Sequence, residues 1–74
     1  MAGGRAEGYQ SRQAELSGWP VRISSWRLAE RWRCEVDNVD PGAVIARAEG
    51  TTREAAETAA CEKAAARLAR TRTF

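Results

Sequence analysis

Arginine and tryptophan are the side chains of this 74-residue sequence whose chemistry best suits a binding surface. Arginine pairs with phosphate or carboxylate through two parallel hydrogen bonds, and tryptophan stacks on bases or anchors a protein interface. If residues 21–49 form strands, alternation of side chains gathers one such set on a single sheet face, together with Ile45: Arg22, Trp26, Arg31, Arg33 and Arg47. We take this set as the first candidate binding surface. A bulge at Ser24–Ser25 would instead return Trp26 to the core.

The same face also carries acids, so a second interpretation stays open. Strand alternation places Glu35, Asp37 and Glu49 among the arginines. Opposite charges on neighbouring strands commonly form exposed cross-strand pairs that contribute little to stability and bind nothing else. We favour these pairs over a platform for single-stranded nucleic acid.

A second basic set follows Glu62, after which the sequence contains no acid. Its members recur at the spacing of one helix face and continue into the last residues: Lys63, Arg67, Arg70 and Arg72. Bases near the end of a helix, with Glu54 and Glu57 near its start, favour any helix through its dipole. Contact with phosphate or an acidic partner and a simple solvated helix end are equally good explanations.

Other residue types exclude most catalytic and metal chemistry. The sequence has no histidine, so Ser-His-Asp and Cys-His nucleophilic sites and histidine-ligated zinc are excluded. Cys34 and Cys61 alone cannot supply a four-thiolate zinc site, and no glycine-rich phosphate loop precedes Lys63. We find no convergent pair of carboxylates. We therefore expect a non-enzymatic protein with no metal, cofactor or small-molecule substrate.

The elements that must position these residues begin after Pro20. Apolar alternation predicts strands over 21–28, 32–37 and 43–49. Ala29–Glu30 is the expected first turn. The second is Asp40-Pro41-Gly42, where proline followed by glycine suits a type II turn.

Residues 1–18 look different, because four glycines interrupt a stretch with few large apolar side chains. We expect a weakly ordered arm, with a short helix over 10–16 as the alternative.

A long helix is predicted over 52–70. Thr51 or Thr52 would cap it, and Thr51 with Glu54 matches the spacing of a capping box. One stripe of small and apolar residues would face the sheet: Ala56, Ala60, Ala64 and Leu68. The expected fold class is α+β, a three-stranded antiparallel sheet covered on one face by this helix. A single domain would span 19–70, with a frayed tail over 71–74.

Composition points to a thin core. Fifteen of the hydrophobic residues are alanine, and 12 basic against 10 acidic residues leave a net charge of +2. We expect Trp32 in the core and Trp19 as a lid over the helix edge. Because so small a core is marginal, pairing of two copies would bury more apolar surface. No run reaches the roughly 20 apolar residues of a membrane span, and no secretory signal is evident, so we expect a cytoplasmic protein.

The stretch Gly50-Thr-Thr-Arg-Glu-Ala-Ala-Glu-Thr-Ala-Ala-Cys61 resembles the start of the second helix of double-stranded-RNA-binding domains. That family has Gly-x-Ser-Lys-Lys-x-Ala-Lys-Asn-Ala-Ala-Ala there, so the glycine and three alanines match. The resemblance implies an α-β-β-β-α order. Two of the family's three phosphate-binding lysines fall on Glu54 and Glu57, and its histidine has no counterpart. The resemblance therefore implies the topology and argues against strong duplex-RNA binding.

Taken together, these patterns predict a small non-catalytic interaction domain. Its partner would be a protein or a second copy, bound through the sheet face or the helix. The alternative is a nucleic-acid-binding module that uses either basic set. No membrane contact is expected.

Overall fold

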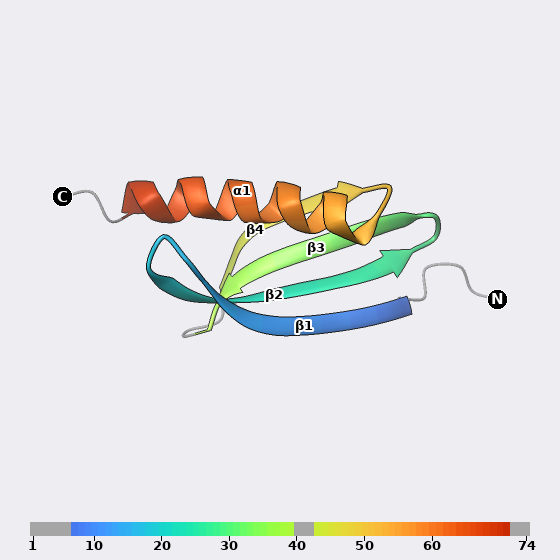
Figure 1. Ribbon diagram of the computed structural model, residues 1–74, viewed down its shortest axis with the longest axis horizontal. Helices are drawn as coiled ribbons and strands as arrows, with labels where there is room; N and C mark the ends of the chain where they lie inside the picture. Colours follow the sequence, from blue (N-terminus) through green and yellow to red (C-terminus); the bar gives the residue numbers. More distant parts are fainter. Residues whose placement is uncertain (1–6, 40–42, 72–74) are drawn as a thin grey trace.

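The strand and helix patterns of the sequence combine into one sheet and one helix in a computed structural model, which describes residues 7–39 and 43–71. Four antiparallel strands lie in chain order, and the helix covers one face of the sheet (Figure 1). The elements are β1 (Glu7–Leu16), β2 (Trp19–Leu28), β3 (Arg31–Asn38), β4 (Val44–Gly50) and α1 (Arg53–Thr71). The α+β class is confirmed, with four strands in place of three.

The N-terminal segment corrects the prediction most. Glu7–Leu16 forms strand β1, so the short helix over 10–16 is wrong and the expected arm is largely part of the sheet. β1 pairs with β2 through a two-residue turn at Ser17–Gly18, where both residues have positive φ, as a type I′ turn requires. Side chains on both faces of β1 are mostly polar and exposed. The alternation that reveals a half-buried strand is therefore absent.

Strand β2 settles the position of Trp26. Its pairing with β3 is continuous from Val21 to Leu28, so the bulge considered at Ser24–Ser25 does not form. Ser25 is fully buried beneath α1, and Trp26 consequently lies on the opposite face. The predicted turn at Ala29–Glu30 is confirmed.

Ala29 adopts a positive φ of 59° in this turn. A left-handed conformation costs a residue with a Cβ about 1–2 kcal/mol, while glycine pays about 0.5–1 kcal/mol in extra chain entropy. We expect Ala29→Gly to raise the free energy of unfolding by up to about 1 kcal/mol. Urea denaturation followed by tryptophan fluorescence measures this. Ala66→Gly, on the exposed side of α1, is the control and should destabilise by about 1 kcal/mol. A destabilised Ala29→Gly variant would contradict the expected strain.

The β3–β4 pairing holds a second correction. Val36 pairs with Ala46, but Asp37 pairs with Val44, so an irregularity leaves Ile45 out of register. Ile45 packs against the core, whereas simple alternation placed it on the arginine face, and Val44 is the exposed residue. The predicted turn at Asp40-Pro41-Gly42 lies outside the described residues.

The core lies between α1 and the sheet. The predicted stripe of Ala56, Ala60, Ala64 and Leu68 is buried, which confirms the helix face. It packs on residues from β2, β3 and β4, namely Val21, Ile23, Cys34, Val36 and Ala46. Trp19 and Trp32 are partly buried against this core. The alanines bring the helix close to the strands because they have no bulk beyond Cβ.

The helix begins one residue later than expected. The backbone N–H of Ala55 donates to Oγ1 of Thr52 at 3.1 Å, so Thr52 is the N-cap. With this cap, the third helical position is Ala55 rather than Glu54. The capping box of Thr51 and Glu54 therefore has the wrong register.

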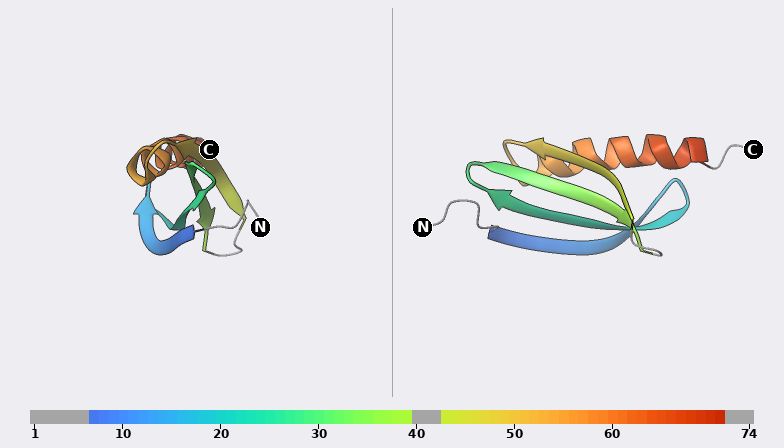
Figure 2. Two further views of the ribbon diagram at one scale, coloured as in Figure 1. Left: turned by 90° about the vertical axis from the view of Figure 1, so that its right-hand side faces the viewer. Right: turned by 180° about the vertical axis from the view of Figure 1, so that it is seen from behind.

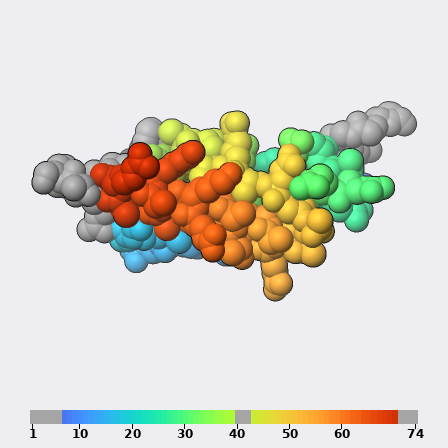
Figure 3. Space-filling model, turned by 90° about the horizontal axis from the view of Figure 1, so that it is seen from above, coloured from blue at the N-terminus to red at the C-terminus, as the bar shows by residue number. Residues whose placement is uncertain are grey.

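The helix is not centred over the sheet. α1 contacts β4 and β3 most and β1 least. Seen end-on, the sheet curves along one side of the helix (Figure 2). From above the helix, β4 lies on one side and the β1–β2 turn on the other (Figure 3). Among the residues that the structure describes, none of the helices or strands covers the other sheet face, and β1 lies away from the helix for most of its length.

Candidate functional site

The uncovered sheet face, which we call the open face, holds the first predicted set. Alternation and pairing place Arg22 and Trp26 of β2, Arg31 and Arg33 of β3 and Arg47 of β4 on it. Tyr9 of β1 joins them, a residue that the sequence analysis did not single out. The register between Glu7 and Gln10 shifts by one residue in β1, and Tyr9 there meets Trp26.

Tyr9 and Trp26 stack on each other. Their ring centroids are 6.0 Å apart and the ring planes differ by 23°. Tyr9 is 62% exposed, whereas Trp26 is intermediate in exposure. A stacked pair on a surface is rigid and largely apolar, and such pairs are frequent anchors of protein interfaces.

Each of the four arginines on the open face pairs with an acid from a neighbouring position. Arg31 and Arg33 lie 3.3 and 3.2 Å from the carboxylate of Glu49, and Arg47 lies 3.1 Å from Glu35. Arg22 lies 3.8 Å from Asp37. Three of these pairs join residues directly opposite across strands. The cross-strand ion pairs expected from the sequence are confirmed, and their exposure limits each to about 0–1 kcal/mol.

Two residues of the second basic set bind backbone carbonyls at the edge of the sheet. The Nζ atom of Lys63 donates to the carbonyl of Arg47 at 3.2 Å, and Arg67 donates to the carbonyl of Ile45. These two carbonyls belong to β4, the outermost strand on that side. The i, i+4 spacing on α1 thus matches the i, i+2 spacing of carbonyls along an edge strand. Arg70 is exposed, and Arg72 lies outside the described residues.

A polar cluster joins β1, β2 and α1 on the other side of the helix. Glu57 accepts a hydrogen bond from Ser25 Oγ at 3.0 Å and forms an ion pair with Arg12 at 3.0 Å. Ser25 is fully buried, so this bond satisfies a hydroxyl that has left water. Arg12 was not expected in a strand, so this ion pair was not predicted from the sequence, where Glu57 was related to the helix dipole.

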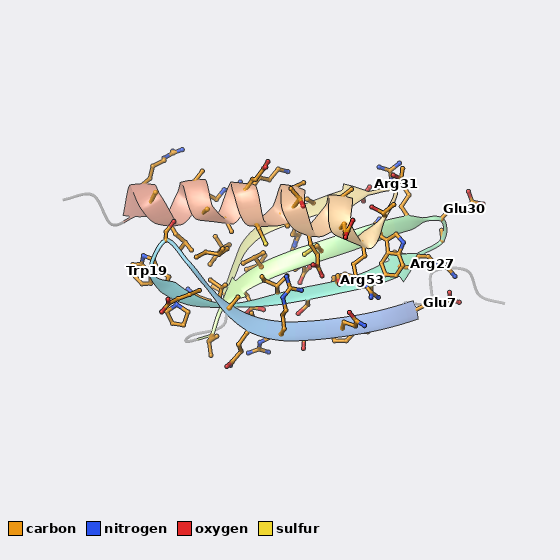
Figure 4. All side chains as sticks on the ribbon, viewed as in Figure 1. Glu7, Trp19, Arg27, Glu30, Arg31 and Arg53 are labelled. Atoms are coloured by element: carbon orange, nitrogen blue, oxygen red, sulfur yellow. The ribbon has the colours of Figure 1, made fainter. Side chains whose placement is uncertain are left out.

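Arg53, at the start of α1, contacts the start of β1. Its guanidinium lies 4.4 Å from the ring centroid of Trp32, and its Nη2 donates to the carbonyl of Gly8 at 2.5 Å. Gly8 has a φ of +63°, and a Cβ there would lie 3.3 Å from the Trp32 ring. Arg53 lies near the end of the molecule that carries Glu30 (Figure 4). The contact orders the segment that presents Tyr9.

The two cysteines are free thiols in this structure. Burial, with smaller contributions from the neighbouring Cys61 and Glu57, raises the pKa of Cys34 from 9.0 to about 12. Burial also raises the pKa of Cys61. Since the thiolate is the reactive form, neither thiol is activated as a nucleophile at neutral pH.

Comparison with known proteins adds no relationship. No protein-family model matches this sequence, and searches of curated proteins and of solved structures find no similar chain. The resemblance to double-stranded-RNA-binding domains thus gains no support, and the α-β-β-β-α order that it implied is replaced by four strands and a helix.

Across the described part of the chain, no three His, Cys, Asp or Glu side chains lie close enough together to hold a metal ion. The one helix described there is too polar to cross a membrane. Chemically, the open face offers a stacked aromatic pair surrounded by four arginines that share three acids in ion pairs.

Proposed function

We propose that this chain is a non-catalytic interaction domain that binds a protein partner through its open face. The observation that supports this best is the Tyr9–Trp26 stack, which leaves a largely exposed tyrosine on a face that no helix or strand of the described residues covers. An aromatic centre surrounded by polar groups matches the usual anatomy of protein interfaces.

The ion pairs favour a protein partner over nucleic acid. Binding to phosphates requires arginines whose charge is available, and affinity then depends steeply on salt. Here each of the four arginines of the face already pairs with Glu35, Asp37 or Glu49, and Glu49 pairs with two of them. On the helix, Lys63 and Arg67 bind carbonyls of β4. Binding of a polyanion would first have to break these contacts.

Photo-crosslinking in the source cells tests the proposal. Replacing Tyr9 with a benzoylphenylalanine should produce a crosslink to a protein, a second copy included, that mass spectrometry identifies. The same replacement at Ala66, exposed on α1, is the positional control. The purified pair is then titrated calorimetrically. Trp26→Ala should weaken its affinity at least tenfold, as loss of an aromatic anchor does. Glu30→Gln, at the exposed β2–β3 turn, should leave it unchanged.

Two results would count against this function. Equal affinities of wild type and Trp26→Ala for the captured partner would remove the open face from the interface. Salt-dependent binding of a single-stranded oligonucleotide, with quenching of tryptophan fluorescence that Trp26→Ala abolishes, would favour the nucleic-acid alternative.

A further inference from the structure

The two edge strands of the sheet differ in how far side chains cover their backbone groups. At the β4 edge, Lys63 and Arg67 cover carbonyls that an added strand would need. At the opposite edge, β1 pairs with β2 on one side, and no other strand of residues 7–39 and 43–71 lies on its other side. Its ten residues are mostly exposed. Only β1 therefore offers a long backbone edge to an incoming chain.

A groove of about 530 Å³ lies along α1, and Arg12 is the residue of β1 in its described lining. Two contacts join the N-terminal strand and its turn to α1 on either side of Arg12: Arg53 binds the carbonyl of Gly8, and Ser17 Oγ donates to the carbonyl of Ala65 at 3.2 Å. From residue 53 to residue 65 a helix rises about 18 Å, which about five residues of extended chain match. The groove therefore has the length of a short strand.

The lining of the groove specifies the chemistry of its occupant. Cys61 and Ala65 form an apolar part, and three acids line the helix side: Glu54, Glu57 and Glu62. Among the described residues, Arg12 is the sole cation of the lining, and it pairs with Glu57. Within residues 7–39 and 43–71, Glu54 and Glu62 form no ion pair, and both are exposed. The net charge of the groove lining is therefore negative, which favours a positively charged ligand.

We propose that the β1–α1 groove binds an extended segment of a partner protein, about five residues long, that carries lysine or arginine on one face. Its backbone pairs with the free edge of β1, and its basic side chains reach Glu54 and Glu62. Backbone pairing supplies affinity in this binding mode, and the alternating side chains supply specificity. The groove lies on the helix side of the sheet, so this site is independent of the open face.

A peptide titration tests the site. The probe is acetyl-Thr-Lys-Val-Lys-Thr-amide, and its matched control has glutamate in place of both lysines. The full ¹⁵N-labelled chain is titrated at low salt, and amide shifts are followed. We expect shifts along β1 and the facing side of α1, with at least tenfold weaker binding of the glutamate peptide. Cys61 should become slower to alkylate as the lysine peptide fills the groove.

Variants and a modified peptide separate the two parts of the proposal. Glu54→Gln combined with Glu62→Gln should weaken binding three- to tenfold, whereas Glu30→Gln should have no effect. A lysine peptide N-methylated at alternate backbone nitrogens keeps its charge but loses donors to β1, so it should bind at least tenfold less tightly.

Several outcomes would overturn the inference. Equal binding of the lysine and glutamate peptides would show that charge does not determine binding. Full affinity of the methylated peptide would show that the peptide does not pair with β1. Shifts confined to the open face would assign the peptide to the other surface. Concentration-dependent β1 shifts without peptide would mean that a second copy occupies this edge instead.

Discussion

Raising the pH from 9 to 12 should reduce the free energy of unfolding by about 1.4 kcal/mol per pH unit through Cys34 alone. Burial raises the pKa of this thiol from 9.0 to about 12 in the folded chain. Below pH 9 the thiol is protonated in both states and its contribution to stability is fully present. Above pH 9 the unfolded chain releases the proton first, so stability falls until the folded-state pKa is reached. The total loss is about 4 kcal/mol.

Urea denaturation at pH 8, 9, 10 and 11 measures this effect. The experiment uses a Cys61→Ala background, so that only one thiol titrates. Because Cys61 contributes to the raised pKa of Cys34, the loss in this background should be smaller than in the wild-type chain. Tyrosine and lysine also titrate in this range, so the informative quantity is the difference in slope between this background and the same chain carrying Cys34→Ala. Identical slopes would show that Cys34 is not protected by burial.

Gly50→Ala should lower the free energy of unfolding by about 3 kcal/mol. A Cβ at this position would lie 2.7 Å from the backbone nitrogen of Ala56 and 2.8 Å from Cβ of Ala55. Both atoms belong to the first turn of α1, which packs directly on the end of β4. Because backbone atoms cannot rotate away, the helix itself would have to move from the sheet. Urea denaturation followed by tryptophan fluorescence provides the measurement.

A double variant tests the cause of this loss. Adding Ala55→Gly removes one of the two close contacts and should recover part of the stability, even though glycine costs about 1 kcal/mol in a helix. A Gly50→Ala chain within about 0.5 kcal/mol of wild type would show that the turn relaxes freely, since that range is typical of an ordinary surface substitution.

Sequence patterns predicted the buried elements well. The alanine stripe on α1 and the inward residues of β3 follow directly from the repeat of burial along a helix and a strand. The ion pairs on the open face were also accessible, because strand alternation already placed acids among the arginines. These features depend on residues close together in the sequence or on a simple period.

Other features left no such signal. β1 is polar on both faces, so its strand character depends on pairing with β2. Because β1 was not predicted, neither the stack of Tyr9 on Trp26 nor the ion pair between Arg12 and Glu57 was expected. Ile45 moved to the core because of an irregularity in register that alternation cannot anticipate.

The basic residues of α1 show what the sequence could predict and what required the tertiary structure. Their spacing was evident from the sequence, which left contact with phosphate or an acidic partner and a simple solvated helix end as equally good explanations. Their role became clear only when the fold brought β4 alongside, with the carbonyls of Ile45 and Arg47 in reach of Arg67 and Lys63. Local periodicity records which side of an element is buried. Contacts between distant residues depend on strand register and on the placement of the helix, and these are properties of the whole fold.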